Sequence, residues 1–321
     1  MVYGAYWLVG AAFGGGEAAE EPVTIVVEQG DTLASVAEKL DEAGVIGSSS
    51  IFELEARVGG NATEIKPGEY SFMPGQDGDE ILETLSSGES GSTFEVTLPE
   101  GLTLEQTAQK VAEQGGVSSE EFEAAARETD YDYAFLKNPA IETTEGFLFP
   151  KTYEFEGSVT AEQIVDRLLQ QYLMETQSLD FVATEERLNL TEYEILTTAS
   201  LIEEEAAGPE EQPVIASVIY NRIRAGMPLQ VDATILYALG EPKERLSLDD
   251  LEVDSPYNTY KNTGLPPGPI ASPGRDAIKA ALEPAETDYL YYVLKPDGGE
   301  HFFTDDYDEF LEAKAEAEEE R

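Results

Sequence analysis

An internal repeat constrains the fold of the first half of this chain more than any other feature. Residues 30–44 match residues 101–115 without a gap, and a strand-like run, residues 24–27 or 93–98, precedes each copy. The identical pairs are Gly30/Gly101, Thr32/Thr103, Leu33/Leu104, Ala37/Ala108, Lys39/Lys110, Glu42/Glu113 and Gly44/Gly115. The sequence therefore predicts one strand–helix unit that is used twice.

A helix is predicted after the Gly-x-Thr-Leu of each copy. Apolar side chains recur there at helical spacing, and Thr32 and Thr103 stand where an N-cap residue belongs. The first copy resembles the LysM module, a small βααβ fold that binds glycan or serves as a spacer. Residues 68–72 would supply its closing strand and residues 79–85 a further helix, and both roles stay open for it.

The chain is strongly acidic and has no cysteine. It carries 66 Asp and Glu against 19 Lys and Arg, a net charge of −47. Such a surface repels nucleic acid and anionic lipid, so a nucleic-acid partner is excluded. The acids are spread along the whole chain, which indicates a folded surface, adapted for example to high salt, rather than an acidic tail. Without Cys there is neither a disulfide nor a thiolate site.

Residues 1–16 carry no charge and are rich in apolar and aromatic side chains. They are fewer than the about 20 apolar residues that a membrane span needs. They also lack the basic region that opens a signal peptide. We interpret them as the end of a membrane helix whose start is missing, with residues 17–22 as a linker; an unstructured start is the alternative.

The second half of the chain reads as mainly helical. Thr160 with Gln163, and Thr191 with Glu194, form capping boxes that open two helices. The helix predicted over residues 192–207 has a buried stripe that ends at Ala206. Further helices are predicted over residues 213–225 and 232–239, and strands over 289–294 and 301–304 with a turn at 296–300.

Three consecutive glutamates lie at the end of the predicted helix 192–207, and each faces a different way. Glu204 points into water, whereas Glu203 and Glu205 lie on opposite borders of the apolar stripe, roughly 160° apart. Partial burial disfavours the charged carboxylate and so raises its pKa, as a general acid needs near neutral pH. Glu203 is therefore a candidate acid, although glutamates are common at such borders.

Two irregular stretches follow, residues 255–260 and 264–274. They are rich in Pro and Gly, and Tyr, Asn and Thr side chains in such loops can stack on sugar rings and bond to them. Asp232 is predicted to cap the helix it begins. Ser272 and Pro273 are predicted as the N-cap and first residue of a helix that reaches Leu282.

The order and spacing of these segments carry a resemblance to a known family. Residues 199–205, 218–222, 229–232, 255–260 and 264–274, with residues 145–153 as a sixth motif, resemble the MltG (YceG-like) family of endolytic murein transglycosylases. The strands at 289–293 and 301–304 match the end of that family, and the resemblance covers about residues 24–310. Two departures are Glu204, where the family usually has a basic residue, and the missing or truncated N-terminal span.

The resemblance implies a membrane-anchored, single-pass protein with its catalytic part outside the cytoplasm. Members cleave the β-1,4 bond between N-acetylmuramic acid and N-acetylglucosamine in nascent strands, leaving 1,6-anhydro ends and ending strand elongation. The implied partners are peptidoglycan glycan strands and peptidoglycan synthases (penicillin-binding proteins). No cofactor and no metal are expected, because one His cannot form a usual metal site.

The family's catalytic glutamate corresponds to Glu203. The side chains expected at the substrate are Glu205, Asp232, Tyr257, Asn258 and Tyr260. For Glu205 we expect a hydrogen bond that fixes a neighbouring loop. Arg222 is expected to be a structural ion-pair partner, and His301 to pack near the cleft.

The expected fold class is α+β, with small LysM-like βααβ subdomains followed by a mainly helical catalytic domain with short strands. The expected segments are a truncated anchor and linker (1–22), a LysM-like subdomain (23–90), a second βα repeat with a connecting segment (91–158), the catalytic domain (159–312) and an acidic tail (313–321).

Three other functions stay open at this point. The chain could be a non-catalytic wall-binding protein that relies on its LysM-like repeat. It could be a muramidase-type hydrolase in which Asp232 activates water. A cytoplasmic role is the third.

Overall fold

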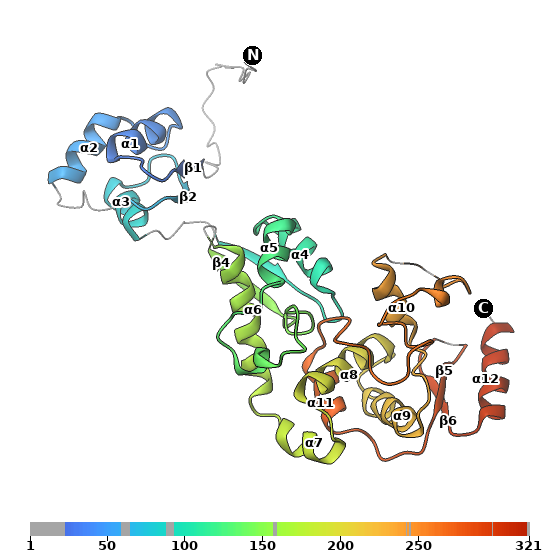
Figure 1. The fold of residues 1–321 in the computed structure, drawn as a ribbon. Helices are drawn as coiled ribbons and strands as arrows, with labels where there is room; N and C mark the ends of the chain where they lie inside the picture. The colour runs from blue at the N-terminus through green and yellow to red at the C-terminus, as the bar shows by residue number, and fades with distance from the viewer. Residues whose placement is uncertain are drawn as a thin grey trace. The chain divides into compact units, whose positions relative to one another are not determined.

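The structure, a computed structural model, describes residues 23–58, 65–87, 93–156, 159–241, 243, 245–296 and 298–319. These residues form two compact units (Figure 1): the first runs to Thr93 and includes Glu156, and the second comprises the described residues of 94–155 and from 159 onward. The predicted anchor at residues 1–22, Asp297 of the predicted turn and the last two residues lie outside the described part. Within that part, no helix is both long enough and apolar enough to cross a membrane.

The first unit has the order β1 (Val23–Val27), α1 (Leu33–Glu42), α2 (Ser49–Val58), β2 (Gly68–Phe72) and α3 (Gly78–Ser87). Strands β1 and β2 pair antiparallel, with Val23 opposite Phe72. Alternate side chains of both strands point into a core that the helices complete, since the strand period of two places every second residue on one face. The predicted strand–helix–helix–strand order and closing helix are present.

The same order occurs a second time, as β3 (Thr93–Thr97), α4 (Leu104–Glu113), α5 (Ser119–Ala126) and β4 (Thr152–Glu156). β3 pairs with β4. A capping box opens the first helix of each copy: the Thr32 and Thr103 hydroxyls accept the N–H groups of Ser35 and Gln106. The prediction of a repeated unit is confirmed, and the second copy extends past its first helix to a second helix and a strand.

The second copy does not form a core of its own. Its apolar side chains, from Val96 to Phe155, belong to one continuous cluster with those of the helices that follow, as far as Leu282. Residues 94–155 and the helices from residue 159 onward therefore belong to one compact unit, because each part buries apolar surface that the other would leave in water.

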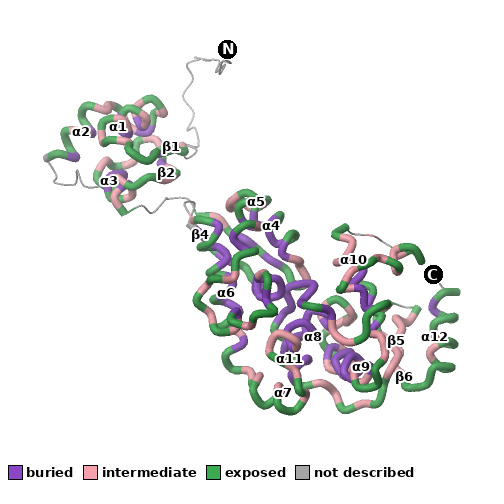
Figure 2. Tube along the Cα trace, viewed as in Figure 1, coloured by how far each residue is buried: buried purple, intermediate pink, exposed green. Residues whose placement is uncertain are grey.

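Between the second copy and the last hairpin, the described residues of the second unit form six α-helices, four of which pack on a fifth. The six are α6 (Ala161–Thr176), α7 (Phe181–Leu188), α8 (Glu192–Glu205), α9 (Gln212–Ala225), α10 (Asp232–Leu239) and α11 (Arg275–Leu282). Helices α7, α9, α10 and α11 all pack on α8. Residues 195–202 of α8 are all buried, as the purple tube in Figure 2 shows. Capping boxes at Thr160 and Thr191 open α6 and α8 as predicted.

The chain ends in a hairpin and a helix. Strands β5 (Tyr291–Leu294) and β6 (His301–Thr304) pair antiparallel, and α12 (Tyr307–Glu319) packs against both. The segment expected as an acidic tail from residue 313 is the second half of α12. The α+β class is confirmed by helices that outnumber three short two-stranded sheets in the described residues.

Arg222 fastens this hairpin to α9, and not through an ion pair. Its guanidinium, buried at 8% exposure, donates to the carbonyl oxygens of Leu290 and Leu229 at 2.6 Å each. It also lies 5.6 Å from the centre of the Tyr291 ring. Carbonyl oxygens take the place of the expected carboxylate. They belong to Leu229, after the end of α9, and to Leu290, just before β5.

We predict that Arg222→Met lowers the free energy of unfolding by about 2 to 4 kcal/mol, because buried carbonyls lose their donors. Chemical denaturation followed by circular dichroism measures the change. The matched control is Arg224→Met, since Arg224 is exposed on the same helix. Equal stability of the two variants would contradict the assigned role of Arg222.

Candidate active site

The last turn of α8 carries the three glutamates out of the core. Glu203 is half-buried, Glu204 exposed and Glu205 half-buried, as the helical pattern predicted. Burial raises the pKa of the Glu203 carboxyl, and one contact opposes it: the Gly274 N–H donates to Glu203 Oε2 at 3.0 Å. Ala206, predicted in the buried stripe, is instead the C-cap residue of α8 and only partly buried.

Gly274 is the N-cap residue of α11, so the predicted cap at Ser272 is wrong by two residues. The backbone of Ser272 is used otherwise: its N–H donates to Leu102 O at 2.8 Å, and its carbonyl accepts from Gly101 N–H at 3.0 Å. A residue paired in this extended way cannot also begin a helix. The loop of residues 98–103 is thereby fixed beside Glu203.

Residues 264–274 are also fastened to α8 directly. The Ile270 N–H donates to the Ser200 hydroxyl at 3.1 Å. Pro269 lies against Gly146, where a Cβ atom would come within 2.5 Å of the proline Cβ. Gly146 also has a φ of +84°, which favours glycine. The motif at residues 145–153 therefore includes a glycine that this loop requires.

Glu205 belongs to a different group of side chains from Glu203. The Tyr292 hydroxyl donates to Glu205 Oε2 at 2.6 Å, and the Tyr260 hydroxyl donates to Asp232. Burial raises the pKa of Glu205 to about 7, although the bond from Tyr292 acts to lower it and the charge of Asp232 acts to raise it. The predicted hydrogen bond of Glu205 is present, and its partner is strand β5 rather than a loop.

Asp232 does not cap α10, because Val231 is the N-cap residue and no side chain caps this helix. The Val231 N–H is taken by the Thr259 hydroxyl at 3.0 Å, which fixes the helix start without Asp232. Asp232 is the first helical residue and exposed. Its carboxylate is consequently free to hold Tyr260, one of the two half-buried tyrosines predicted at the substrate.

Asn258, which the sequence placed at the substrate, is fully buried. Its amide donates to the carbonyls of Leu251 and Val253, and its oxygen accepts the N–H of Tyr260 at 2.9 Å. The side chain is thus used within its own loop, and it fixes the loop that presents Tyr257 and Tyr260. A short amide side chain in a turn can form hydrogen bonds with nearby backbone groups instead of with a ligand, and the sequence pattern does not distinguish the two.

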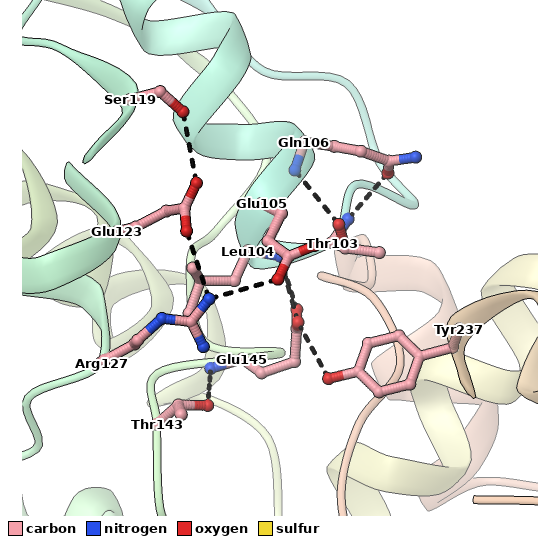
Figure 3. A network of polar contacts seen from close by, with 10 residues as sticks. All are labelled: Thr103, Leu104, Glu105, Gln106, Ser119, Glu123, Arg127, Thr143, Glu145 and Tyr237. Atoms are coloured by element: carbon pink, nitrogen blue, oxygen red, sulfur yellow. Dashed lines mark hydrogen bonds and ion pairs between the residues drawn. The ribbon is translucent and has the colours of Figure 1, made fainter. Parts of the chain in front are cut away.

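Tyr257 packs on Tyr237 of α10, with ring centres 4.8 Å apart. Glu145, a buried carboxyl that was not among the predicted site residues, faces Tyr237 (Figure 3). The Leu104 N–H donates to its two oxygens at 3.0 and 3.1 Å, and the Tyr237 hydroxyl donates at 3.3 Å. Glu145 therefore joins the start of α4 to the tyrosine pair. The sequence feature that could have indicated a buried carboxyl is the position of Glu145 directly before the apolar residues 146–149.

His301, predicted near the cleft, is bound to Glu211 at the start of α9. Its backbone N–H donates to Glu211 Oε1 at 2.6 Å, and Nδ1 lies 2.7 Å from Glu211 Oε2. In the part of the chain that the structure describes, no three His, Asp or Glu side chains are grouped to hold a metal ion.

A surface hollow of about 350 Å³ lies between α11 and the segment that joins α8 to α9. Asp276, in the first turn of α11, lines it, and the charge of Asp276 also acts on Glu203. The hollow is bordered mainly by polar and charged residues: Pro209, Glu210, Gln212, Pro213, Asp276, Lys279, Ala280 and Glu283.

The arrangement favours chemistry by one acid. Glu203 combines partial burial with a single backbone donor, so it can hold a proton and then be stabilised as an anion. Glu205 and Asp232 each accept a hydrogen bond from a different tyrosine, Tyr292 and Tyr260.

Comparison with known proteins gives consistent matches over most of the chain. The model of the YceG-like family matches residues 25–316. A Bacillus subtilis protein named endolytic murein transglycosylase is 36% identical over 96% of this chain and 90% of its own length. A Streptococcus pneumoniae protein of the same name is 33% identical over 89% of this chain, which spans 57% of that longer relative. The crystal structure of a YceG-like protein from Listeria monocytogenes superposes with a TM-score of 0.62 at 33% identity, covering 92% of this chain and 99% of that one.

The Glu145 carboxyl predicts a specific pH dependence of stability. Burial raises its pKa from 4.5 to about 7 in the folded chain. The folded chain binds this proton more tightly than the unfolded chain does, which adds to the free energy of unfolding. This stabilisation is fully present below pH 4.5 and is lost as the pH rises through 7, a change of about 3 kcal/mol in the free energy of unfolding. We predict that Glu145→Gln gains stability relative to the wild type across this interval.

Denaturation curves of both proteins between pH 4 and 8 measure this difference. Glu142→Gln is the matched control, because Glu142 is an exposed glutamate of the same segment. A stability difference between Glu145→Gln and wild type that does not change with pH would sink the assignment.

Proposed function

The chain belongs to the YceG-like family, and from this premise we propose that it is an endolytic lytic transglycosylase of peptidoglycan. Its substrate would be the β-1,4 bond between N-acetylmuramic acid and N-acetylglucosamine within a glycan strand. The observation that carries the proposal is the half-buried Glu203 at the end of α8, in a chain that matches relatives named for this reaction over nearly its whole length.

The mechanism uses Glu203 twice. The protonated carboxyl gives its proton to the glycosidic oxygen as the bond to C1 of the muramic acid breaks. The carboxylate that results then takes the proton of the muramic acid 6-hydroxyl, whose oxygen closes on C1 to form the 1,6-anhydro ring. Glu203 ends the cycle protonated, and no water is consumed.

This route needs no second carboxylate on the protein, because the attacking oxygen belongs to the substrate. Most glycosidases place two carboxyl groups across the scissile bond, one of them for a water or as nucleophile. Asp232 accepts the Tyr260 hydroxyl and Glu205 accepts the Tyr292 hydroxyl, which supports the one-acid route over the muramidase alternative in which Asp232 activates water.

The surroundings of Glu203 suit both of its states. Partial burial favours the neutral acid before bond cleavage. The Gly274 N–H, at the start of α11, favours the anion after cleavage, since helix N-termini attract negative charge. A carboxyl that must alternate between the two forms is best served by opposing influences of this kind.

We assign sugar contacts to Tyr257 and Tyr260, which are half-buried and so present part of each ring to solvent. Glu205 and Asp232 would orient Tyr260 and bond to sugar hydroxyls. Asn258 supports this surface through the loop it fixes. The tyrosine pair 237/257 gives a platform on which a pyranose ring can stack.

Three further features are part of the proposal. The second unit would act outside the cytoplasm, held at the membrane by a single N-terminal anchor. The first unit would be a LysM-like glycan-binding or spacer module. Peptidoglycan synthases would be the partners that supply nascent strands, whose elongation the cut would end.

We predict that Glu203→Gln lowers the rate of strand cleavage at least about 10³-fold, because Gln cannot transfer the proton. Glycan strands are incubated with each protein at low and high salt, and the products are identified by mass spectrometry. Wild type is expected to leave 1,6-anhydro-muramic ends. Glu204→Gln, which changes the exposed neighbour, is expected to retain activity.

The products separate the alternatives. Reducing muramic acid ends would move the enzyme to the hydrolases. Absence of cleavage at every salt concentration, with glycan still bound, would replace the enzyme with a wall-binding protein.

A further inference from the structure

A second glutamate, Glu100, lies against Gly274, the residue that donates to Glu203. A Cβ atom on residue 274 would lie 1.8 Å from Glu100 Oε1 and 2.3 Å from its carboxyl carbon. The Glu100 carboxyl therefore occupies the space that any other residue at this position would fill. The same glycine donates its N–H to Glu203 Oε2. Two carboxyl groups from distant parts of the sequence thus contact one residue.

The backbone places Glu100 there. The next residue, Gly101, donates its N–H to Ser272 O, and Ser272 donates to Leu102 O, so the loop is paired with the chain just before Gly274. Gly101 itself has a φ of +79° and lies against Glu204, where a Cβ atom would be 2.8 Å from Oε1. The loop that carries Glu100 is consequently fixed from two sides.

The charged side chains that act on Glu203 in the described part of the chain are negative. Glu100 acts on it from the β3–α4 loop and Asp276 from the first turn of α11, and Glu204 adjoins it on α8. Arg275 directly follows Gly274 in the sequence, but its guanidinium binds other groups. It donates to the Glu175 carbonyl and to the Ser178 hydroxyl, each at 3.1 Å. Glu100 is thus not neutralised by this arginine.

We propose that Glu100 is a positioning residue of the active site, whose negative charge beside Gly274 keeps Glu203 in its protonated, proton-donating form. The inference rests on the proposed function of Glu203. The negative charge of Glu100 disfavours a second negative charge on Glu203, so Glu203 holds its proton more tightly. Burial of Glu203 favours the neutral acid most strongly, the bond from Gly274 favours the anion, and the charge of Glu100 adds to the effect of burial.

The experiment compares the pH dependence of strand cleavage by the full chain and by Glu100→Gln. Activity requires protonated Glu203, so it falls as the pH rises through the pKa of Glu203. Loss of the Glu100 charge lowers that pKa, and the alkaline limb is expected to move about 0.5 to 1 pH unit toward acid. Above the limb, the rate falls about 3- to 10-fold relative to wild type.

Two further variants sharpen the comparison. Glu95→Gln removes one charge from the exposed face of the preceding strand and should leave the limb where it is. Gly274→Ala keeps a permitted backbone, with φ −71° and ψ 170°, but displaces the Glu100 carboxyl. It is expected to shift the limb like Glu100→Gln, and combining both changes should give no larger shift.

A titration separates this inference from the proposed reaction. Carbon-13 NMR of glutamate-labelled protein, with Glu203 assigned through Glu203→Gln, follows the carboxyl without any substrate. A lower pKa of Glu203 in Glu100→Gln supports the role of Glu100 even if no strand is cleaved. An unchanged pKa together with an unmoved limb overturns it, and leaves the proposed function standing.

Discussion

The burial of α8 is the constraint on which the rest of the second unit depends. Every residue from 195 to 202 is buried, and four helices pack around this segment. The helix cannot turn about its axis without bringing apolar side chains into water, which would cost several kcal/mol. The directions in which Glu203, Glu204 and Glu205 leave the core are thereby set before any ligand is present. A general acid benefits from this rigidity, because its proton must meet one oxygen of a bound strand.

The second copy of the repeat has been put to a different use from the first. The first copy encloses its own core, whereas the second shares one with the helices and lends its Gly-x-Thr-Leu turn to the Glu203 site. Gly30 and Gly101 both adopt positive φ, so the turn itself is the same in both copies. What differs is the partner: the second turn pairs with Ser272. Glu145, bound to the first helical residue after that turn, extends the link to the tyrosine pair (Figure 3).

Local signals in the sequence predicted much of this fold, and long-range contacts account for what they missed. Capping boxes at Thr103 and Thr191 depend on residues three positions apart, so they can be read directly. Asp232 carries the same kind of signal, but Thr259, far along the chain, takes the N–H that fixes the start of α10. The helical period placed Glu203 at a border correctly. It could not reveal that Glu100, a hundred residues earlier, contacts the same glycine.

The net charge of −47 raises the question of which carboxylates govern Glu203. Charges on the exposed surface act through water, and salt screens them beyond about 10 Å at 0.1 M and about 3 Å at 1 M. Burial and contacts at hydrogen-bonding distance are screened far less. A site that relied on the general field of the acidic surface would therefore change its proton affinity with every change of salt. Partial burial and the Gly274 N–H act at short range, so these two influences on the proton of Glu203 persist at any ionic strength in which the chain folds, whereas salt can screen the charge of the exposed Glu100.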